Sequence, residues 1–69
     1  MDLKQKIGKQ IKTRRNQLRM EQVDLQDYAE IGSTTLSKLE QGKANITLGT
    51  LEKILDVLGM EVVIKVKGL

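Results

Sequence analysis

The chain has 69 residues and a formal net charge of +3, and it contains neither cysteine nor histidine. This length allows one domain, and a domain so small buries only about 60% of its unfolded surface. The composition excludes disulfides, thiolate metal sites and cysteine nucleophiles, and no carboxylate cluster suggests a metal. We therefore expect no metal and no cofactor, and oligomerisation is the leading source of additional stability.

Apolar residues never form a run long enough to cross a bilayer, which requires about 20. The longest run is three residues, at positions 62–64. Charged residues interrupt the first segment, where a secretory signal would have its apolar region. We expect a soluble, cytoplasmic protein without a membrane partner.

Charge is distributed unevenly along the chain. Residues 1–20 carry seven lysines or arginines against one aspartate, whereas residues 21–31 carry four acids and no base. A basic first segment suggests a polyanionic partner. An ordinary solvated helix face explains the same charges, and charge alone favours that second reading.

Apolar residues recur at helical spacing and predict four helices. These cover residues 3–18, about 22–30, about 33–41, and a stretch that starts after Thr47, a good N-cap, and ends at Gly59. The positions expected to face the core in the first, second and fourth helices are Leu3, Ile7, Ile11 and Leu18; Val23, Leu25 and Ala29; and Leu48, Leu51, Ile54, Leu55 and Leu58.

The final segment changes to a period of two, which predicts a strand over residues 60–67. Its apolar face comprises Met60, Val62, Ile64 and Val66. A single strand has no partner within the chain, and an unpaired edge invites aggregation. Two copies that pair their strands antiparallel across a two-fold axis would remove this edge. The alternative is a tail that frays in solution.

The second and third helices are separated only by Ile31 and Gly32, and such a pair predicts a helix-turn-helix. In this motif the second helix enters the DNA major groove. At 100° per residue, Leu36 and Leu39 point inward. The opposite side carries hydrogen-bonding residues without an acid, namely Thr34, Ser37, Lys38 and Gln41.

Residues 21–43, EQVDLQDYAEIGSTTLSKLEQGK, resemble the helix-turn-helix of the phage repressor/Cro (XRE) family, and the resemblance extends without a gap over residues 7–59. The matching positions are Arg15, Gln22, Leu25, Ala29, Ile31, Leu36, Ser37, Leu39, Glu40 and Gly42. The resemblance implies a structural ion pair between Arg15 and Glu40. It also implies base-reading roles for Ser33, Thr34, Ser37 and Lys38, and phosphate contacts from Gln22, Gln41, Lys43 and Asn45.

Three residues depart from the family pattern. Gln26 stands where the family usually has alanine, and Glu30 replaces the usual glycine at the end of the second helix. Gly32 replaces a common serine cap, so we expect the cap to shift to Ser33. These departures affect the detail of the turn.

The ending LGMEVVIKV resembles the HipB-type antitoxins and related small regulators, in which terminal strands pair across the dimer. We therefore expect a mainly α fold. It comprises a four-helix, repressor-like helix-turn-helix domain over residues 1–59, with a recognition helix at about 33–41, and a dimerisation strand within residues 60–69.

The sequence thus predicts a sequence-specific transcriptional regulator, a dimeric repressor on a pseudo-palindromic operator in double-stranded DNA. An autoregulating antitoxin with a kinase-like toxin partner is a subclass that rests on resemblance alone. The alternative is a protein-interaction module, toxin-neutralising or scaffolding, with weak or no DNA binding, which the acidic second helix allows. We do not expect an enzyme, because the residues for general acid–base and nucleophilic chemistry are missing.

Overall fold

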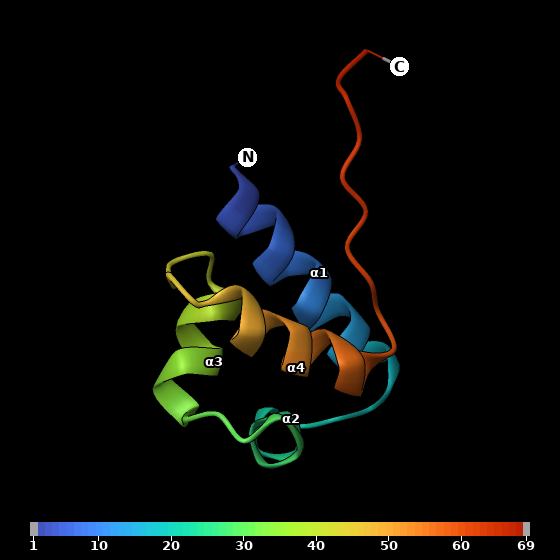
Figure 1. Cartoon of the computed structure of the whole chain (residues 1–69). Helices are drawn as coiled ribbons and strands as arrows, with labels where there is room; N and C mark the ends of the chain where they lie inside the picture. The colour runs from blue at the N-terminus through green and yellow to red at the C-terminus, as the bar shows by residue number, and fades with distance from the viewer. Residues whose placement is uncertain (1, 69) are drawn as a thin grey trace.

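A computed structural model describes residues 2–68, so the outermost residues of the two predicted segments, 1 and 69, lie outside it. The described chain forms four helices: α1 (Leu3–Gln17), α2 (Gln22–Ala29), α3 (Ser33–Glu40) and α4 (Leu48–Leu58). α1 packs against α3 and α4, and α2 packs against the same two helices (Figure 1). The prediction of a mainly α, four-helix domain is confirmed.

Local chemistry explains where most helices begin and end. Asp2 and Gln5 form a reciprocal capping box at the start of α1, with the Gln5 N–H donating to Asp2 Oδ1 at 2.8 Å. Thr47 caps α4 by accepting from the Thr50 N–H at 3.1 Å, and Gly59 ends this helix with a φ of 68°. Both ends of α4 are as predicted.

The start of α3 differs from the sequence-based expectation. Gly32, not Ser33, is the N-cap residue, and Ser33 is already helical. Gly32 has an extended backbone, and its carbonyl oxygen accepts from the Leu36 N–H at 3.2 Å. The first turn therefore closes without a side-chain cap, and the shift of the cap to Ser33 was wrong.

The core is one cluster of side chains contributed by all four helices. Its buried members are Ile11, Leu25, Ala29, Leu36, Leu39, Leu51, Ile54, Leu55 and Leu58. Four residues that we expected to face the core are instead exposed: Leu3, Leu18, Val23 and Leu48. All four lie in the first turn of a helix or just beyond its end, where the apolar stripe continues past the neighbouring elements.

Residues 60–68, which we call the tail, extend away from the helical body (Figure 1). The backbone of Met60 is held by its N–H, which donates to the Leu55 carbonyl oxygen at 2.9 Å. Beyond it, Val62, Ile64 and Val66 are 61%, 92% and 70% exposed. No strand is assigned anywhere in residues 2–68 of this single chain, so the pairing of tails stays a prediction.

Within the described residues, no helix has both the length and the apolar content needed to traverse a bilayer.

Gly8 marks the closest approach between α1 and α3. A Cβ at this position would overlap the Leu39 carbonyl oxygen and lie 3.2 Å from the Glu40 carbonyl carbon. Both neighbours are backbone atoms at the end of α3, so they cannot move aside without moving the helix. Gly8 therefore sets how close α3 lies to α1.

We expect Gly8→Ala to lower the free energy of unfolding by about 1–3 kcal/mol, because overpacking outweighs the better helix propensity of alanine. Gly49→Ala is the matched control. Its Cβ would meet nothing closer than Thr47 Oγ1 at 3.9 Å, so propensity alone should stabilise the protein by up to about 1 kcal/mol. Urea unfolding of both variants measures this, and equal shifts would contradict the close-approach argument.

Glu30 preserves the turn after α2 at an energetic penalty. It adopts the left-handed conformation, with φ 57° and ψ 47°, which glycine tolerates best. Glu30 therefore adopts the left-handed backbone conformation expected of a glycine, although its own side chain makes that conformation strained.

We expect Glu30→Gly to raise the free energy of unfolding by about 1 kcal/mol through release of this strain. Glu30→Ala removes the same carboxylate but keeps a Cβ, so it should give little or no gain. Thermal or urea unfolding compares the two variants. Similar stabilisation by both would show that charge, not backbone strain, is responsible.

Candidate nucleic-acid interface

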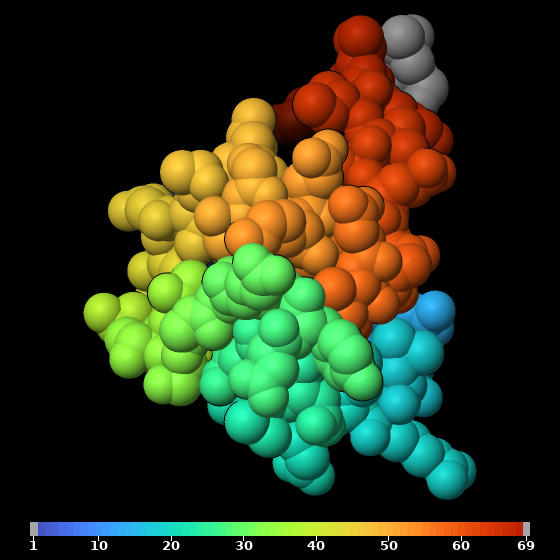
Figure 2. All heavy atoms as spheres, turned by 60° about the horizontal axis from the view of Figure 1, so that its bottom comes forward, coloured from blue at the N-terminus to red at the C-terminus, as the bar shows by residue number. Residues whose placement is uncertain are grey.

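α3 is held by its inner face and leaves its outer face open. Leu36 and Leu39 are 0% and 4% exposed, whereas Ser33, Thr34 and Lys38 are exposed. Figure 2 shows α3 beside α2 on the face of the molecule that lies away from the tail. A helix that approaches base edges in the groove needs an exposed face with short polar side chains.

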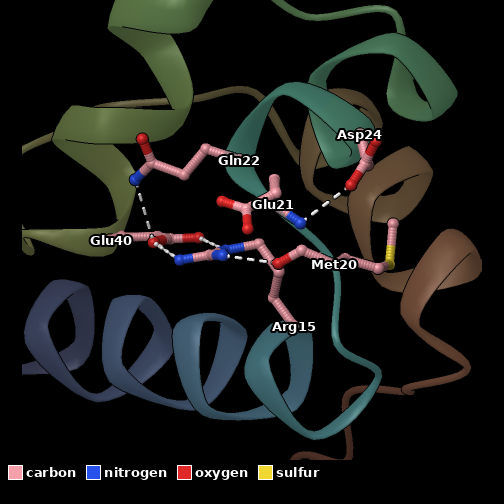
Figure 3. A network of polar contacts seen from close by, with 6 residues as sticks. All are labelled: Arg15, Met20, Glu21, Gln22, Asp24 and Glu40. Carbon is pink, nitrogen blue, oxygen red and sulfur yellow. Dashed lines mark hydrogen bonds and ion pairs between the residues drawn. The ribbon is translucent and has the colours of Figure 1, made fainter.

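An ion pair joins α3 to α1 (Figure 3). Arg15 Nε donates to Glu40 Oε2 at 2.7 Å, and Arg15 Nη2 donates to Glu40 Oε1 at 2.9 Å. The two side chains are only 8% and 3% exposed. This two-point geometry fixes both the distance and the orientation of the end of α3 relative to α1.

Two further hydrogen bonds extend the ion pair to the start of α2. Arg15 Nη1 donates to the Met20 carbonyl oxygen at 2.7 Å, and Gln22 Nε2 donates to Glu40 Oε1 at 3.1 Å (Figure 3). The hydrogen bond to Glu40 raises the pKa of Arg15 above its usual value, while burial opposes this rise. Arg15 therefore stays charged at any pH near neutrality.

The network changes how the predicted phosphate contact at Gln22 is understood. One hydrogen of its Nε2 is already used by Glu40. On the other side of the helix start, the Asp24 carboxylate accepts from the Glu21 N–H at 2.8 Å, which brings negative charge to the start of α2 (Figure 3). In this structure Gln22 supports the ion pair, and its contact with phosphate stays a prediction.

The loop after α3 places the other predicted phosphate ligands. Gly42 has a φ of 77°, and the Lys43 N–H donates to the Lys38 carbonyl oxygen at 2.9 Å. Lys43 and Asn45 are exposed beyond this turn. Gln41 Nε2 donates to Ser37 Oγ at 3.2 Å, so a predicted phosphate ligand and a predicted base reader contact each other.

Sequence reasoning missed Arg14. Its Nε donates to the Leu58 carbonyl oxygen at 2.9 Å, which joins α1 to the last turn of α4, immediately before the tail. A basic residue is favourable at a helix C-terminus, but the distance of 44 positions in the sequence leaves no local signal of the contact.

The Helix-turn-helix family HTH_3 matches residues 11–64, a span that includes α2, α3, α4 and the C-terminal part of α1. The chain therefore belongs to this XRE-type helix-turn-helix family. Its members are DNA-binding transcriptional regulators, and this chain is one of them. No curated protein matches the chain.

We expect Arg15→Met and Glu40→Met each to lower the free energy of unfolding by about 3–5 kcal/mol, because each leaves a buried charge without its partner. The double variant should lose much less. Lys12→Met, on the exposed side of α1, is the control and should stay within about 0.5 kcal/mol of the parent.

Urea unfolding of the four proteins completes a double-mutant cycle. Because the raised pKa of Arg15 lies far above neutrality, stability from its charge is lost only at strongly alkaline pH, and the coupling should not change between acidic and neutral buffers through Arg15. Small, additive effects would mean that the pair contributes no more than an exposed one.

Proposed function

We propose that the chain is a sequence-specific, dimeric repressor that places α3 in the major groove of double-stranded DNA and acts in the cytoplasm. The observation that carries this proposal is the exposed, acid-free outer face of α3, held in place by the buried pair Arg15–Glu40. A rigidly held polar helix can present the same donors and acceptors to each operator.

Within this proposal the predicted contact residues divide into two groups, and all but Ser37 and Gln22 are fully exposed. Ser33, Thr34, Ser37 and Lys38 read base edges from α3. Phosphates are contacted by Gln22 at the start of α2, by Gln41 at the end of α3, and by Lys43 and Asn45 in the loop that follows α3. Lys43 is the best supported of the second group, because it is an exposed cation on a loop tied to the end of α3.

We also propose that two copies associate through the tail and bind a pseudo-palindromic operator. The helical residues up to 59 then act as the DNA-binding unit, and the segment 60–69 as the dimerisation unit. Met60 packs against the core, whereas Val62, Ile64 and Val66 leave apolar surface exposed. Burial of each such side chain contributes about 1.5–3 kcal/mol, which is large for so small a domain.

A finer version of the proposal is an autoregulating antitoxin that also binds a kinase-like toxin. It is supported only by the resemblance of the ending to HipB-type antitoxins. Co-purification with the product of a neighbouring gene tests it.

The second candidate is an interaction module, toxin-neutralising or scaffolding, with weak or no DNA binding. The observation in its favour is the acidity of α2 and its flanks, where Glu21, Asp24, Asp27 and Glu30 gather beside the DNA-facing helix. Selection of bound sites from random double-stranded DNA separates the two candidates. A repressor should enrich a pseudo-palindrome with half-site centres about 34 Å apart, whereas an interaction module should enrich nothing.

On the selected operator, we expect Lys43→Ala to weaken binding to all sequences alike and to reduce the salt dependence by about one phosphate contact. Lys38→Ala should also relax preference at one base position, because it loses a contact to a base edge. Binding titrations on the operator and its single-base variants measure both effects. Uniform weakening by Lys38→Ala would remove Lys38 from base reading.

A further inference from the structure

The tail carries a second pattern besides its apolar face. Glu61, Val63, Lys65 and Lys67 occupy the alternate positions, and all four are exposed in the single chain. Glu61 and Lys65 are of opposite sign and equally spaced about Val63. A strand with this arrangement is complementary to its own copy in the reversed direction.

Symmetry restricts how two tails can pair. A two-fold axis between antiparallel strands lies normal to the ribbon and keeps every side chain on its own face. The axis therefore passes where one residue lies opposite its own copy, and the choices that retain a long overlap are Val63 and Ile64. Moving the axis from Val63 to Ile64 changes the residue that lies opposite each position by two.

With the axis at Val63, each Glu61 lies opposite a Lys65 of the second copy. On the other face Met60 lies opposite Val66, and Val62 lies opposite Ile64. Opposite charges and paired apolar residues directly across a ribbon both stabilise it. With the axis at Ile64, Glu61 lies opposite Lys67 and Val62 opposite Val66, so this register also pairs opposite charges. It places each Lys65 opposite an apolar Val63, however, and sets Met60 opposite Gly68, which has a φ of 83° and no side chain to pair. Only the axis at Val63 matches every residue of the overlap with one of its own kind or of opposite charge.

The start of the tail indicates which face of the ribbon is directed to solvent, and this holds for either register. Met60 lines an open groove of about 420 Å³ along α1, together with Lys9 and Arg14. Because Met60 alternates in step with Val62, Ile64 and Val66, the apolar face of the tail continues from this groove. The face with Glu61, Val63 and Lys65 is then directed to solvent, which suits its charges.

We propose that two copies of this chain pair their tails in one register, with the two-fold axis at Val63 and two Glu61–Lys65 ion pairs across the ribbon. This inference rests on the dimer of the proposed function and specifies its geometry. Moving the axis to Ile64 would slide one copy by two residues, about 6.8 Å, or about two base pairs of DNA. The register thus sets the spacing of the operator half-sites.

Single-cysteine variants of the full chain test the register, because the sequence contains no cysteine. Val63→Cys should form a disulfide-linked dimer on mild oxidation. The matched controls Val62→Cys and Ile64→Cys should not cross-link alone, because each cysteine is offset from its copy by two residues along the ribbon, beyond the Cα separation of about 7 Å that a disulfide spans. A mixture of these two controls should cross-link, because positions 62 and 64 lie opposite each other.

The outcomes separate the register from the dimer. Cross-linking of Ile64→Cys alone would move the axis and overturn the register, and equal cross-linking at all three positions would indicate parallel strands. Sedimentation of the unmodified chain provides the second measurement. A dimer without any of these cross-links overturns the register only, whereas a monomer at tens of micromolar overturns the proposed dimer as well.

Charge reversal provides an independent test. We expect Glu61→Lys or Lys65→Glu each to raise the dimer dissociation constant about tenfold, since two attractive cross-strand pairs become repulsive. The double variant should restore it. Lys67→Glu is the matched control, because residue 67 lies beyond the overlap in this register and should change the constant little. Rescue of Glu61→Lys by Lys67→Glu, and not by Lys65→Glu, would place the axis at Ile64.

Discussion

The position of α3 depends on the buried pair Arg15–Glu40. Removing two charges from water is unfavourable. The attraction between Arg15 and Glu40 offsets this desolvation penalty only because the geometry is good and the polar atoms that remain are hydrogen-bonded. Met20 and Gln22 supply those bonds from the start of α2. One guanidinium therefore joins α1, the turn before α2 and the end of α3, and the three elements that border the proposed DNA-facing surface are positioned together.

Two backbone features adjust the helices around that pair. Gly8 lets α1 approach the end of α3 closely enough for the ion pair to form at 2.7–2.9 Å. Glu30 holds the left-handed turn that sends the chain from α2 into α3. The first feature needs the absence of a side chain, whereas the second accepts strain. Both position α3, and neither contributes a side chain to the core.

Much of the fold could be predicted from local patterns. Helical periodicity located four helices, and Thr47 and Gly59 marked the ends of α4. Periodicity does not show where the neighbouring helix ends, and an apolar side chain beyond that end is left uncovered. Leu3 and Leu48 were wrongly assigned to the core for this reason. The pair Arg15–Glu40 came from resemblance, and contacts such as Arg14 to Leu58 depend on tertiary geometry that spacing does not encode. The roles of the base-reading residues depend on a DNA partner, which local patterns do not describe.

Arg14 and Arg15 are neighbours in sequence but are bonded to different helices. Arg15 holds the end of α3, and Arg14 holds the last turn of α4, from which the tail departs. α1 therefore connects the helix proposed to contact DNA with the segment proposed to pair at the two-fold axis. If the chain binds DNA as the proposed dimer, these bonds would oppose a change in the distance between its two α3 helices, and an operator of imperfect spacing would then be accommodated by twisting or bending of the DNA. Base pairs between the half-sites would then influence affinity through their stiffness, although no side chain touches them.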